Sequence, residues 1–589
     1  MNAILKGIRQ ELRDMGELSA LNELVAGPCP DGASNEPTEE MWDYHDDSQE
    51  EIYDSVTGMQ LDPQKVKKAR EEELGWVEKQ KIYEEADIQE CWDATGAPPI
   101  TLKWVDRDKG NSNYRSRLVV REIKRKGQAL PDHDLYSAMP PLEALKVLCS
   151  LMVSKKRSAR GGALKMRILD ISRAHFYGAS RRPVFTNLPP GREKEGKCAR
   201  LLRTMYGTQD ASSVWQETYT ELLQEHGVEA GVAWPALFYH EPTDSRFLCH
   251  GDDFVVLADD EGQKFIEGVL AKRFEYRVDG CIGPDPNDGS VMTVLNRILE
   301  YNKQTGELQY EPDPRHCAQV VKQLGLENSK PVSTPSEKMT SKEVLEALDL
   351  PMLPPEQQSA YRSIVMRCAY LSQDRADICE SVKTLARFMA KPTEHSWSKL
   401  KRLGRYLKGA PRVVQTFKPQ EMYNTLAVYT DSDHAGCLFT RKSTSGLVVM
   451  AGGHCLKASS TAQSTIALSS GESEFYAIVK ASACVLGMRA LYNEWRIPLT
   501  CTVFSDSSAA RGMCNRRGLS GKTRHIQTRY LWVQQQLHQR EIELRKVHTN
   551  DNLADLCAKP VGQEVCQRHL TTLGQNVREG VSVAAKTNT

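Results

Sequence analysis

The sequence predicts an α+β protein of several domains, and three observations support this prediction. First, 589 residues are too many for a single hydrophobic core. Second, strand-like runs alternate with helical runs between residues 131 and 335, and again between residues 426 and 560. Third, a helical block at residues 356–409 separates these two regions, as expected for a connection between two mixed domains.

The elements before residue 131 are predicted from charge and from turn residues. Residues 1–27 carry apolar residues at helical spacing, and residues 28–56 are acidic and turn-rich, which is typical of a linker. Residues 62–90 form a charged helical stretch. Residues 98–126 have the pattern of a hairpin with its tip at GNSN, and its returning strand carries Arg115, Arg117 and Arg121.

The composition argues against several classes of protein. The 77 basic residues balance the 77 acidic ones, so any nucleic-acid-binding surface must be local. The 16 cysteines form no C-x-x-C pair, which argues against a zinc knuckle and favours a reducing compartment. The N-terminal residues lack the apolar run of a signal peptide, and no run of about 18 apolar residues indicates a transmembrane helix. We therefore expect a soluble protein without a membrane partner.

Two predicted strands carry acidic residues at their ends. LKMRILD ends at Asp170, and the hairpin FLCHGDDFVVL contains the adjacent pair Asp252 and Asp253. A carboxylate at the end of a buried strand is costly without a partner. Two like charges in a turn are either solvated or neutralised by a cation, and three converging carboxylates provide the oxygen ligands that Mg²⁺ prefers. Both interpretations of the pair stay open on these residues alone.

Four further acidic residues lie where predicted strands end or predicted helices begin. They are Asp431 after LAVYT, Glu474 in the first turn of ESEFYAIVKA, Asp506 after TVFS, and Asp555 in NLADL. Each alone is equally a turn residue or an acid at a helix N-terminus. Asp433 and Glu472 are nearby alternatives. Asp431 is preferred because it directly follows the apolar strand, and Glu474 because its helical face continues to apolar residues.

Residues 395–409, HSWSKLKRLGRYLKG, form a predicted basic helix. Such a helix either presents a solvated face or follows the phosphates of a nucleic acid. Its cations are Lys399, Lys401, Arg402, Arg405 and Lys408.

Several blocks of sequence, in order, resemble one known family. ITLKWV, YRSRLVVRE, LDISRAHFYG, VFTNLPPGRE, LLRTMYGTQDASSVWQ and CHGDDFVVLADD resemble the reverse transcriptase of copia-type LTR retrotransposons over residues 98–335. RADI, LARFM and RYLKG resemble the helical segment that joins polymerase to nuclease in this family. YTDSDHAGCLFTRKSTSG, SSGESEFYAI, VFSDSSAA, KTRHIQTRYLWV and NLADLCAKP resemble its RNase H domain over residues 428–560.

The resemblance implies a right-hand polymerase of fingers, palm and thumb, joined by a helical connection to an RNase H-like mixed α/β domain. The chain then resembles the 3′ half of a retrovirus-related Pol polyprotein. The implied division is an N-terminal helix and acidic linker at residues 1–60, a reverse transcriptase at 61–335, a helical connection at 336–420, an RNase H-like domain at 421–562 and a tail at 563–589.

The resemblance also implies two sites that each use two Mg²⁺ or Mn²⁺ ions. Catalysis and metal binding are assigned to Asp170, Asp252 and Asp253 in the polymerase and to Asp431, Glu474, Asp506 and Asp555 in the nuclease. Contacts with the incoming nucleotide are assigned to Arg115, Arg117, Arg121, His175 and Phe176, and contacts with nucleic acid to the five cations of the basic helix.

The implied partners are an RNA template, a DNA primer, an RNA–DNA hybrid, dNTPs and other products of the retroelement polyprotein. The implied location is a retroelement particle in the cytoplasm, or the nucleus. The function implied by the resemblance, and favoured by the seven retained acidic residues, is an RNA-directed DNA polymerase with ribonuclease H activity that replicates a retrotransposon.

The chain departs from the family pattern at several positions. His175 replaces an aromatic residue, Asp210 replaces a glutamine and Ser213 replaces an arginine. These departures favour an alternative function, that of a decayed or co-opted retroelement remnant that binds RNA or DNA without turnover. In addition, Gly251 directly precedes Asp252 and predicts a loose turn.

Overall fold

The computed structural model describes residues 52–55, 58–110, 113–123, 131, 135–340, 342–343, 350–521 and 523–579. The predicted N-terminal helix, most of the acidic linker and the end of the tail lie outside these residues. The chain divides into two compact units, which we describe separately. Unit 1 comprises Met1–Met139, Ile171–Val228 and Gly268–Arg277, and unit 2 comprises Pro140–Asp170, Glu229–Glu267 and Val278–Thr589. This division differs from the predicted domain borders, which remain predictions.

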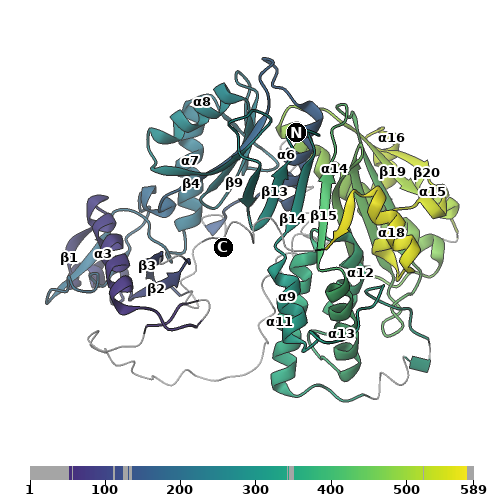
Figure 1. Cartoon of the computed structure of the whole chain (residues 1–589), viewed down its shortest axis with the longest axis horizontal. Helices are drawn as coiled ribbons and strands as arrows, with labels where there is room; N and C mark the ends of the chain where they lie inside the picture. Colours follow the sequence, from purple (N-terminus) through teal and green to yellow (C-terminus); the bar gives the residue numbers. More distant parts are fainter. Residues whose placement is uncertain are drawn as a thin grey trace. The chain divides into compact units, whose positions relative to one another are not determined.

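Unit 1 contains a long helix, a hairpin and a small sheet (Figure 1). Helix α3 (Pro63–Lys79) begins where the Asp62 side chain accepts hydrogen bonds from two backbone amides and proline occupies the first turn. The hairpin pairs β2 (Leu102–Asp108) with β3 (Tyr114–Val120). The sheet has the order β1-β6-β5, with β1 (Tyr83–Asp87), β6 (Lys197–Leu201) and β5 (Phe185–Thr186). The helical elements α4 (Ile88–Thr95), η1 (Ala174–Tyr177) and α7 (Ala211–Glu225) complete the described part.

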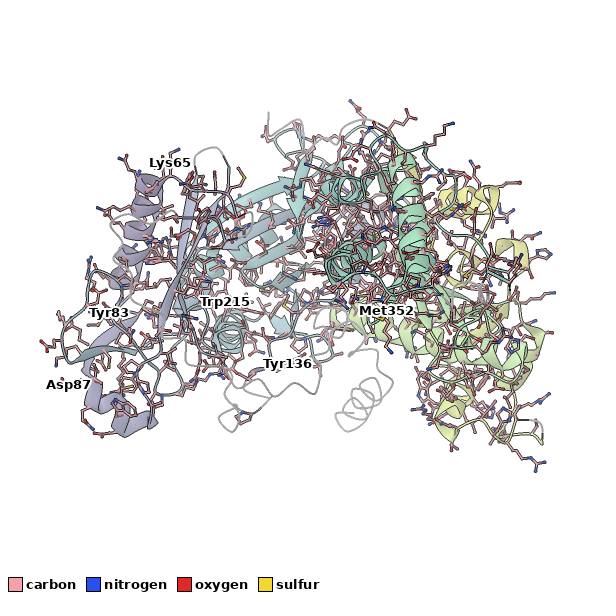
Figure 2. The ribbon with its side chains drawn as sticks, turned by 90° about the horizontal axis from the view of Figure 1, so that it is seen from below. Lys65, Tyr83, Asp87, Tyr136, Trp215 and Met352 are labelled. Carbon is pink, nitrogen blue, oxygen red and sulfur yellow. The ribbon has the colours of Figure 1, made fainter. Side chains whose placement is uncertain are left out.

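Two sequence predictions in unit 1 are wrong in detail. The helix predicted over residues 62–90 ends at Lys79, and β1 follows, with its ends Tyr83 and Asp87 labelled in Figure 2. Burial of Ile82 and Ala86 and pairing of β1 with β6 outweigh the helical pattern of charges. In the hairpin, β3 ends at Val120, so Arg121 lies beyond the strand on which it was predicted.

The first sheet of unit 2 has six strands in the order β11-β4-β10-β9-β8-β7. Helix α6 (Leu142–Lys155) contacts β9 and β10, and it is buried along nearly its whole length because it is apolar on all sides. Helix α8 (Asp260–Ala271) follows β10. The strands are β4 (Lys165–Ile171), β7 (Glu229–Ala230), β8 (Leu237–His240), β9 (Ser245–His250), β10 (Asp253–Ala258) and β11 (Tyr276–Ile282).

A second sheet combines strands from distant parts of the sequence. Its order is β12-β13-β14-β15-β21, and all adjacent strands pair antiparallel. The strands are β12 (Val291–Val294), β13 (Arg297–Tyr301), β14 (Leu308–Pro312), β15 (Arg412–Phe417) and β21 (Gln575–Arg578). The tail, which shows no strong sequence pattern, therefore contributes a strand as well as helix α18 (Gln563–Thr572).

The predicted helical block is present as α11 (Pro355–Ser372), α12 (Cys379–Ala386) and α13 (Glu394–Gly409), which Figure 1 shows beside α9 (Arg315–Gln323). Helix α9 precedes the predicted block and shares one hydrophobic core with it.

The third sheet of unit 2 is mixed and has the order β18-β17-β16-β19-β20. The first three strands pair antiparallel, and β19 and β20 run parallel to β16. The strands are β16 (Thr425–Asp433), β17 (Thr444–Ala451), β18 (His454–Ala462), β19 (Thr500–Ser505) and β20 (Glu543–Lys546). The helices are α14 (Ser470–Glu494), α15 (Ser508–Cys514), α16 (Trp532–His538) and α17 (Asp555–Ala558). The predicted α+β class is confirmed.

Helix α14 is long and apolar enough to span a membrane by length and composition, and it is the one such helix among the described residues. Most of that apolar stretch is buried inside unit 2, where α14 contacts β16, β17 and β19. Its apolar character is therefore that of a core helix.

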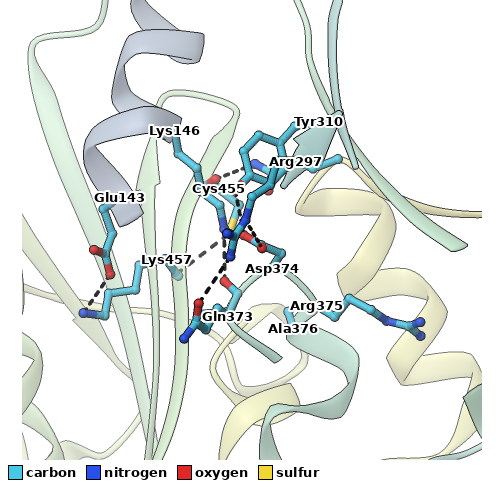
Figure 3. A network of polar contacts seen from close by, with 12 residues as sticks. Glu143, Lys146, Arg297, Tyr310, Gln373, Asp374, Arg375, Ala376, Cys455 and Lys457 are labelled. Carbon is cyan, nitrogen blue, oxygen red and sulfur yellow. Dashed lines mark hydrogen bonds and ion pairs between the residues drawn. The ribbon is translucent and has the colours of Figure 1, made fainter. Parts of the chain in front are cut away.

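A buried network of charges connects α6, β13, β14 and the end of α11 (Figure 3). The Asp374 carboxylate lies 3.0 Å from Lys146 Nζ and 3.1 Å from Arg297 Nε, and it accepts a 2.9 Å hydrogen bond from the Tyr310 hydroxyl. Burial alone would raise the pKa of Asp374, but Lys146 and Arg297 hold it below its usual value. One carboxylate thus neutralises cations from two separate elements.

We expect Asp374→Asn to lower the free energy of unfolding of unit 2 by about 3–5 kcal/mol, because two cations then stay buried without their counter-charge. Urea unfolding followed by tryptophan fluorescence measures this change. Glu356→Gln, at an exposed position of α11, is the control and should change stability by less than about 0.5 kcal/mol. Equal unfolding midpoints for both variants would contradict the prediction.

Candidate active sites

Asp170, Asp252 and Asp253 come together in the six-stranded sheet of unit 2. Asp253 is the first residue of β10 and pairs across the sheet with Asp170 of β4. One oxygen from each of the three carboxylates lies within 4.8 Å of the other two, and all three side chains are half-buried. Carboxylates at this separation repel one another unless a cation lies among them, and their oxygens suit a hard divalent ion.

The turn that carries Asp252 requires its glycine. Gly251 and Asp252 form a two-residue connection between β9 and β10, with φ +69° at Gly251 and no positive φ at Asp252. This is the pattern of a type II′ hairpin turn, which favours glycine at the first position. A Cβ at Gly251 would meet nothing within 4 Å, so the backbone conformation alone explains the glycine. The glycine is thus explained by the turn conformation, and the prediction that it loosens the turn stays a prediction.

The predicted nucleotide-binding residues lie in unit 1. The Arg117 guanidinium lies 4.6 Å from the ring centroid of Tyr206, and the ring of His175 lies 4.8 Å from the same ring. Tyr206 therefore brings Arg117 and His175 together. The sequence analysis did not single out Tyr206, although an aromatic residue before a glycine in LLRTMYGTQ was an available signal. Phe176, in contrast, is 1% exposed and belongs to the core of unit 1.

The other two arginines differ in their surroundings. Arg115 is half-buried on β3 and lies on the same face as Arg117, because strand residues two apart point to the same side. It pairs across the hairpin with another arginine, Arg107. Arg121 is exposed.

Asp210 has a cationic partner within unit 1. Arg182 Nη2 lies 3.2 Å from Asp210 Oδ1, and the same guanidinium donates hydrogen bonds of 2.7 and 2.6 Å to the two oxygens of Glu122. Burial alone would lower the pKa of Arg182, but Glu122 and Asp210 raise it. Arg182 thus offsets part of the negative charge that Asp210 and Glu122 bring together.

Four cations of the basic helix bind the chain's own segment 327–339. Arg402 pairs with Glu337 at 2.7 Å, Arg405 donates to the Lys330 carbonyl at 2.7 Å, and Lys408 donates to the Glu327 and Ser329 carbonyls at 2.6 Å. Lys399 Nζ lies 2.8 Å from the sulfur of Met339. Lys401 is exposed and forms no ion pair with the described residues. This arrangement differs from a helix whose whole basic face is open to phosphates.

Asp431, Glu474 and Asp506 come together over the third sheet, with one oxygen of each within 4.8 Å of the others. Two details differ from the prediction. Strand β16 continues to Asp433, which pairs with Thr444, so Asp431 lies inside the strand. Helix α14 begins at Ser470 after an N-cap serine, so Glu474 lies in its second turn.

Asp555, the fourth predicted acid, is joined to this group by a lysine. Lys559 Nζ lies 3.1 Å from Asp431 Oδ2 and 2.9 Å from Asp555 Oδ1. Burial raises the pKa of Asp431, and the Lys559 charge opposes this shift. The sequence analysis missed Lys559. Its position four residues after Asp555 was the available signal, because side chains at this spacing meet on a helix.

Among the acidic residues of this group, Glu474 has the pKa that is displaced furthest from its usual value. Burial, followed by the charges of Asp431 and Asp506, raises the pKa of Glu474 to about 9. Its Oε1 accepts a hydrogen bond from the Ser432 amide at 3.1 Å, whereas its buried Oε2 has no hydrogen-bond partner among the described residues. A buried oxygen without a donor, facing two further carboxylates, fits a bound divalent ion.

The two nearby acids have other partners. Asp433 accepts hydrogen bonds from the amide and the hydroxyl of Thr444. Glu472 accepts hydrogen bonds from the Tyr476 hydroxyl at 2.8 Å and the Leu468 amide at 3.0 Å, and it lies 3.0 Å from His525 Nε2. The structure therefore places both residues in local hydrogen-bond networks, outside the carboxylate group.

Gly446 allows α17 to lie close to the sheet. It pairs with Asp431, and a Cβ added to it would lie 2.6 Å from the Ala558 nitrogen and 2.7 Å from the Ala554 oxygen. We expect Gly446→Ala to lower the free energy of unfolding by about 1–3 kcal/mol, because the backbone of α17 must shift. The same shift moves Asp555, so the ribonuclease activity predicted from the sequence should fall together with stability.

Thermal unfolding and cleavage of a labelled hybrid test this prediction. The matched control is Gly487→Ala on α14, where a Cβ meets nothing within 4 Å. This change should keep the activity and stabilise the helix by up to about 1 kcal/mol. The prediction fails if both alanine variants behave alike.

Comparison with protein families matches residues 91–283 to the family described as reverse transcriptase (RNA-dependent DNA polymerase). The retrovirus-related Pol polyprotein from transposon TNT 1-94 of Nicotiana tabacum is 24% identical over 523 residues, covering 85% of this chain and 37% of that protein. An uncharacterised mitochondrial protein of Arabidopsis thaliana is 31% identical over 169 residues, covering 29% of this chain and 68% of that protein.

Among solved structures, the foamy viral protease–reverse transcriptase in complex with dsDNA gives a TM-score of 0.45 at 12% identity, covering 82% of this chain and 83% of that chain. The chain spans 37% of the length of the tobacco polyprotein. With the motifs described above, the family match and the plant relatives show that the chain belongs to the copia-type, retrovirus-related Pol polyproteins and carries their reverse transcriptase segment.

Proposed function

We propose that this chain is an RNA-directed DNA polymerase with ribonuclease H activity that uses Mg²⁺ or Mn²⁺, two ions at each site, to replicate a retrotransposon. One observation carries the proposal: two separate groups of predicted metal ligands, Asp170, Asp252 and Asp253 in one and Asp431, Glu474 and Asp506 in the other, each bring their carboxylate oxygens within 4.8 Å of one another. RNA template, DNA primer and dNTPs are the proposed substrates. Location in a retroelement particle in the cytoplasm, or in the nucleus, remains a prediction.

In the polymerase, Asp170, Asp252 and Asp253 would hold the ions. When bound, such ions activate a 3′-hydroxyl and stabilise the pyrophosphate that leaves. The chain's own contribution is positioning. The pairing of β4 with β10 places Asp253 beside Asp170, and the turn at Gly251 presents Asp252 next to both. We propose that Arg115, Arg117 and Arg121 contact the triphosphate, with Arg117 supported on the ring of Tyr206, and that His175 faces the sugar.

In the nuclease, Asp431, Glu474, Asp506 and Asp555 would hold the ions that let water cut the RNA strand of a hybrid. Glu474 takes up a proton readily when no ion is bound, because burial and its neighbours raise its pKa to about 9. Lys559 keeps Asp431 and Asp555 close together. We propose that Lys401 contacts the nucleic-acid backbone, since it is the exposed cation of the basic helix.

Primer extension tests the polymerase. Purified full chain is given a primed RNA template and dNTPs with Mg²⁺, with Mn²⁺ or with EDTA. Extension with either ion and none with EDTA is the expected result. A hybrid labelled on its RNA strand tests the nuclease under the same three conditions. Binding of the hybrid with neither extension nor cleavage would instead identify a decayed or co-opted copy.

A further inference from the structure

Unit 1 contains a pocket of about 760 Å³ that includes none of the site residues predicted from the sequence. The pocket is formed by the end of α3, the segments after η1 and β6, and the end of α8 with the loop that follows. Its charged lining residues are Lys79, Lys81, Arg203, Lys272, Arg273 and Glu275. Five cations therefore face one carboxylate.

Most of these cations are not neutralised. Lys79 pairs with Glu275 at 3.1 Å, but Lys81, Arg203 and Arg273 form no ion pair with any residue that the structure describes. Some other surface cations of unit 1 are paired, as in Arg192–Glu78, Lys194–Glu85 and Lys197–Asp87, whereas Lys67 and Lys68 on α3 are exposed without an ion pair to the described residues. What distinguishes the pocket is that several unpaired cations line one concave surface, in a chain whose net charge is zero.

A histidine holds Lys272 in place. The Lys272 Nζ lies 2.6 Å from His226 Nε2, and His226 Nδ1 lies 2.8 Å from the Leu222 carbonyl oxygen. An ammonium only donates and a carbonyl only accepts, so Nε2 suits the lysine as an acceptor and Nδ1 suits the carbonyl as a donor. The imidazole ring therefore orients the ammonium.

Helix ends explain only part of this charge. Helices α3 and α8 both end at the pocket, and lysines there stabilise the negative end of each helix. Five cations and one carboxylate leave a charge of +4, and two helix C-termini remove about half a charge each, so roughly +3 remains. The remainder is available to a ligand.

The floor of the pocket is apolar. Tyr177 and Phe274 are buried there, and Leu202 is 41% exposed. The Tyr177 hydroxyl oxygen accepts a 2.9 Å hydrogen bond from the Glu275 amide, which fixes the floor to the basic wall. A concave site of this volume, with an apolar floor and converging charges, is typical of small-ligand sites.

We propose that this pocket binds an oligophosphate group, carried either by a free nucleotide or inorganic polyphosphate or by the 5′ end of a nucleic-acid strand. Several adjacent negative charges match several unpaired cations, and arginine and lysine are the usual partners of phosphate oxygens.

Isothermal titration with inorganic tripolyphosphate tests the proposal, using the full chain at low salt in EDTA. Without divalent ions the carboxylate groups repel phosphate, so they do not compete for the probe. We expect the double variant Lys81→Glu, Arg273→Glu to bind at least tenfold more weakly. The matched control Lys67→Glu, Lys68→Glu changes the charge equally at exposed positions of α3 outside the pocket, and it should bind within twofold of the unchanged chain.

Three further titrations identify which kind of molecule carries the oligophosphate. Their ligands are a nucleoside triphosphate, a short RNA with a 5′ triphosphate, and the same RNA with a 5′ hydroxyl. Tighter binding of the triphosphorylated RNA indicates a strand end, and equal binding of the first two indicates a free ligand. The proposal is overturned if tripolyphosphate does not bind at millimolar concentration, if the pocket variant binds it unchanged, or if Arg117→Ala abolishes binding while the pocket variant does not. Thermal unfolding confirms that each variant is folded.

Discussion

DNA synthesis on a primed RNA template is expected to fall by at least three orders of magnitude when Asp252 is replaced by asparagine. Asparagine has the same size and keeps the hairpin turn, but it removes one negative charge from the group formed with Asp170 and Asp253. Loss of about 4 kcal/mol of transition-state stabilisation, a reasonable value for a disrupted metal site, corresponds to roughly a 10³-fold slower reaction. Single-turnover extension measures this rate directly.

The second aspartate pair in the same segment supplies a control. Asp260→Asn changes an exposed carboxylate in the first turn of α8. Lys165, which pairs with Asp260, also lies 2.7 Å from Asp285 and 3.1 Å from Asp288. It therefore keeps two carboxylate partners when Asp260 loses its charge. Extension by this variant should therefore remain close to that of the unchanged chain. Equal extension by Asp252→Asn and the unchanged chain would rule out the proposed polymerase site.

Replacing Glu474 with glutamine is expected to have opposite effects on activity and stability. Cleavage of the RNA strand should fall by roughly 10³-fold, because a charged ligand is lost from the metal site. The metal-free protein should become more stable. The pKa of Glu474 rises from 4.5 to about 9 on folding, so ionisation disfavours the folded state progressively as pH rises from about 4.5 to about 9. Glutamine cannot ionise and removes this penalty at pH 7.

Glu472→Gln is the matched control, two residues earlier on the same helix. Burial would raise the pKa of Glu472, but its contacts with His525, Tyr476 and the Leu468 amide lower it. This variant should therefore be less stable than the unchanged chain, with its metal-ligand set intact. Thermal unfolding in EDTA at pH 7 and cleavage of a labelled hybrid separate the two variants. A less stable Glu474→Gln would show that its charge is already compensated.

Much of the first site follows from the sequence, because its geometry is local. Asp252 and Asp253 lie between two strand-like runs, so a hairpin was predictable, and β4 supplies Asp170. The turn conformation itself was not predicted, since glycine is unfavourable in most strands and favoured at the first position of a type II′ turn. Only the backbone dihedral at position 251 separates these two cases.

Features that join distant segments were not predictable in the same way. The strand β21 pairs with β15, and the cations of α13 bind segment 327–339. Neither β21 nor segment 327–339 has a sequence pattern that predicts these contacts. Lys559 stands beside Asp431 only because Gly446 lets α17 approach the sheet. Such contacts depend on packing between elements, which hydrophobic periodicity does not describe.

The ammonium of Lys559 also bears on whether the C-terminal domain needs a bound metal ion in order to fold. A domain whose only counter-charge is its metal ion unfolds when the ion is removed. In this chain a covalently attached cation already neutralises part of the charge between Asp431 and Asp555. We therefore expect this domain to stay folded in EDTA, and the proposed cleavage of RNA to return when a divalent ion is added back.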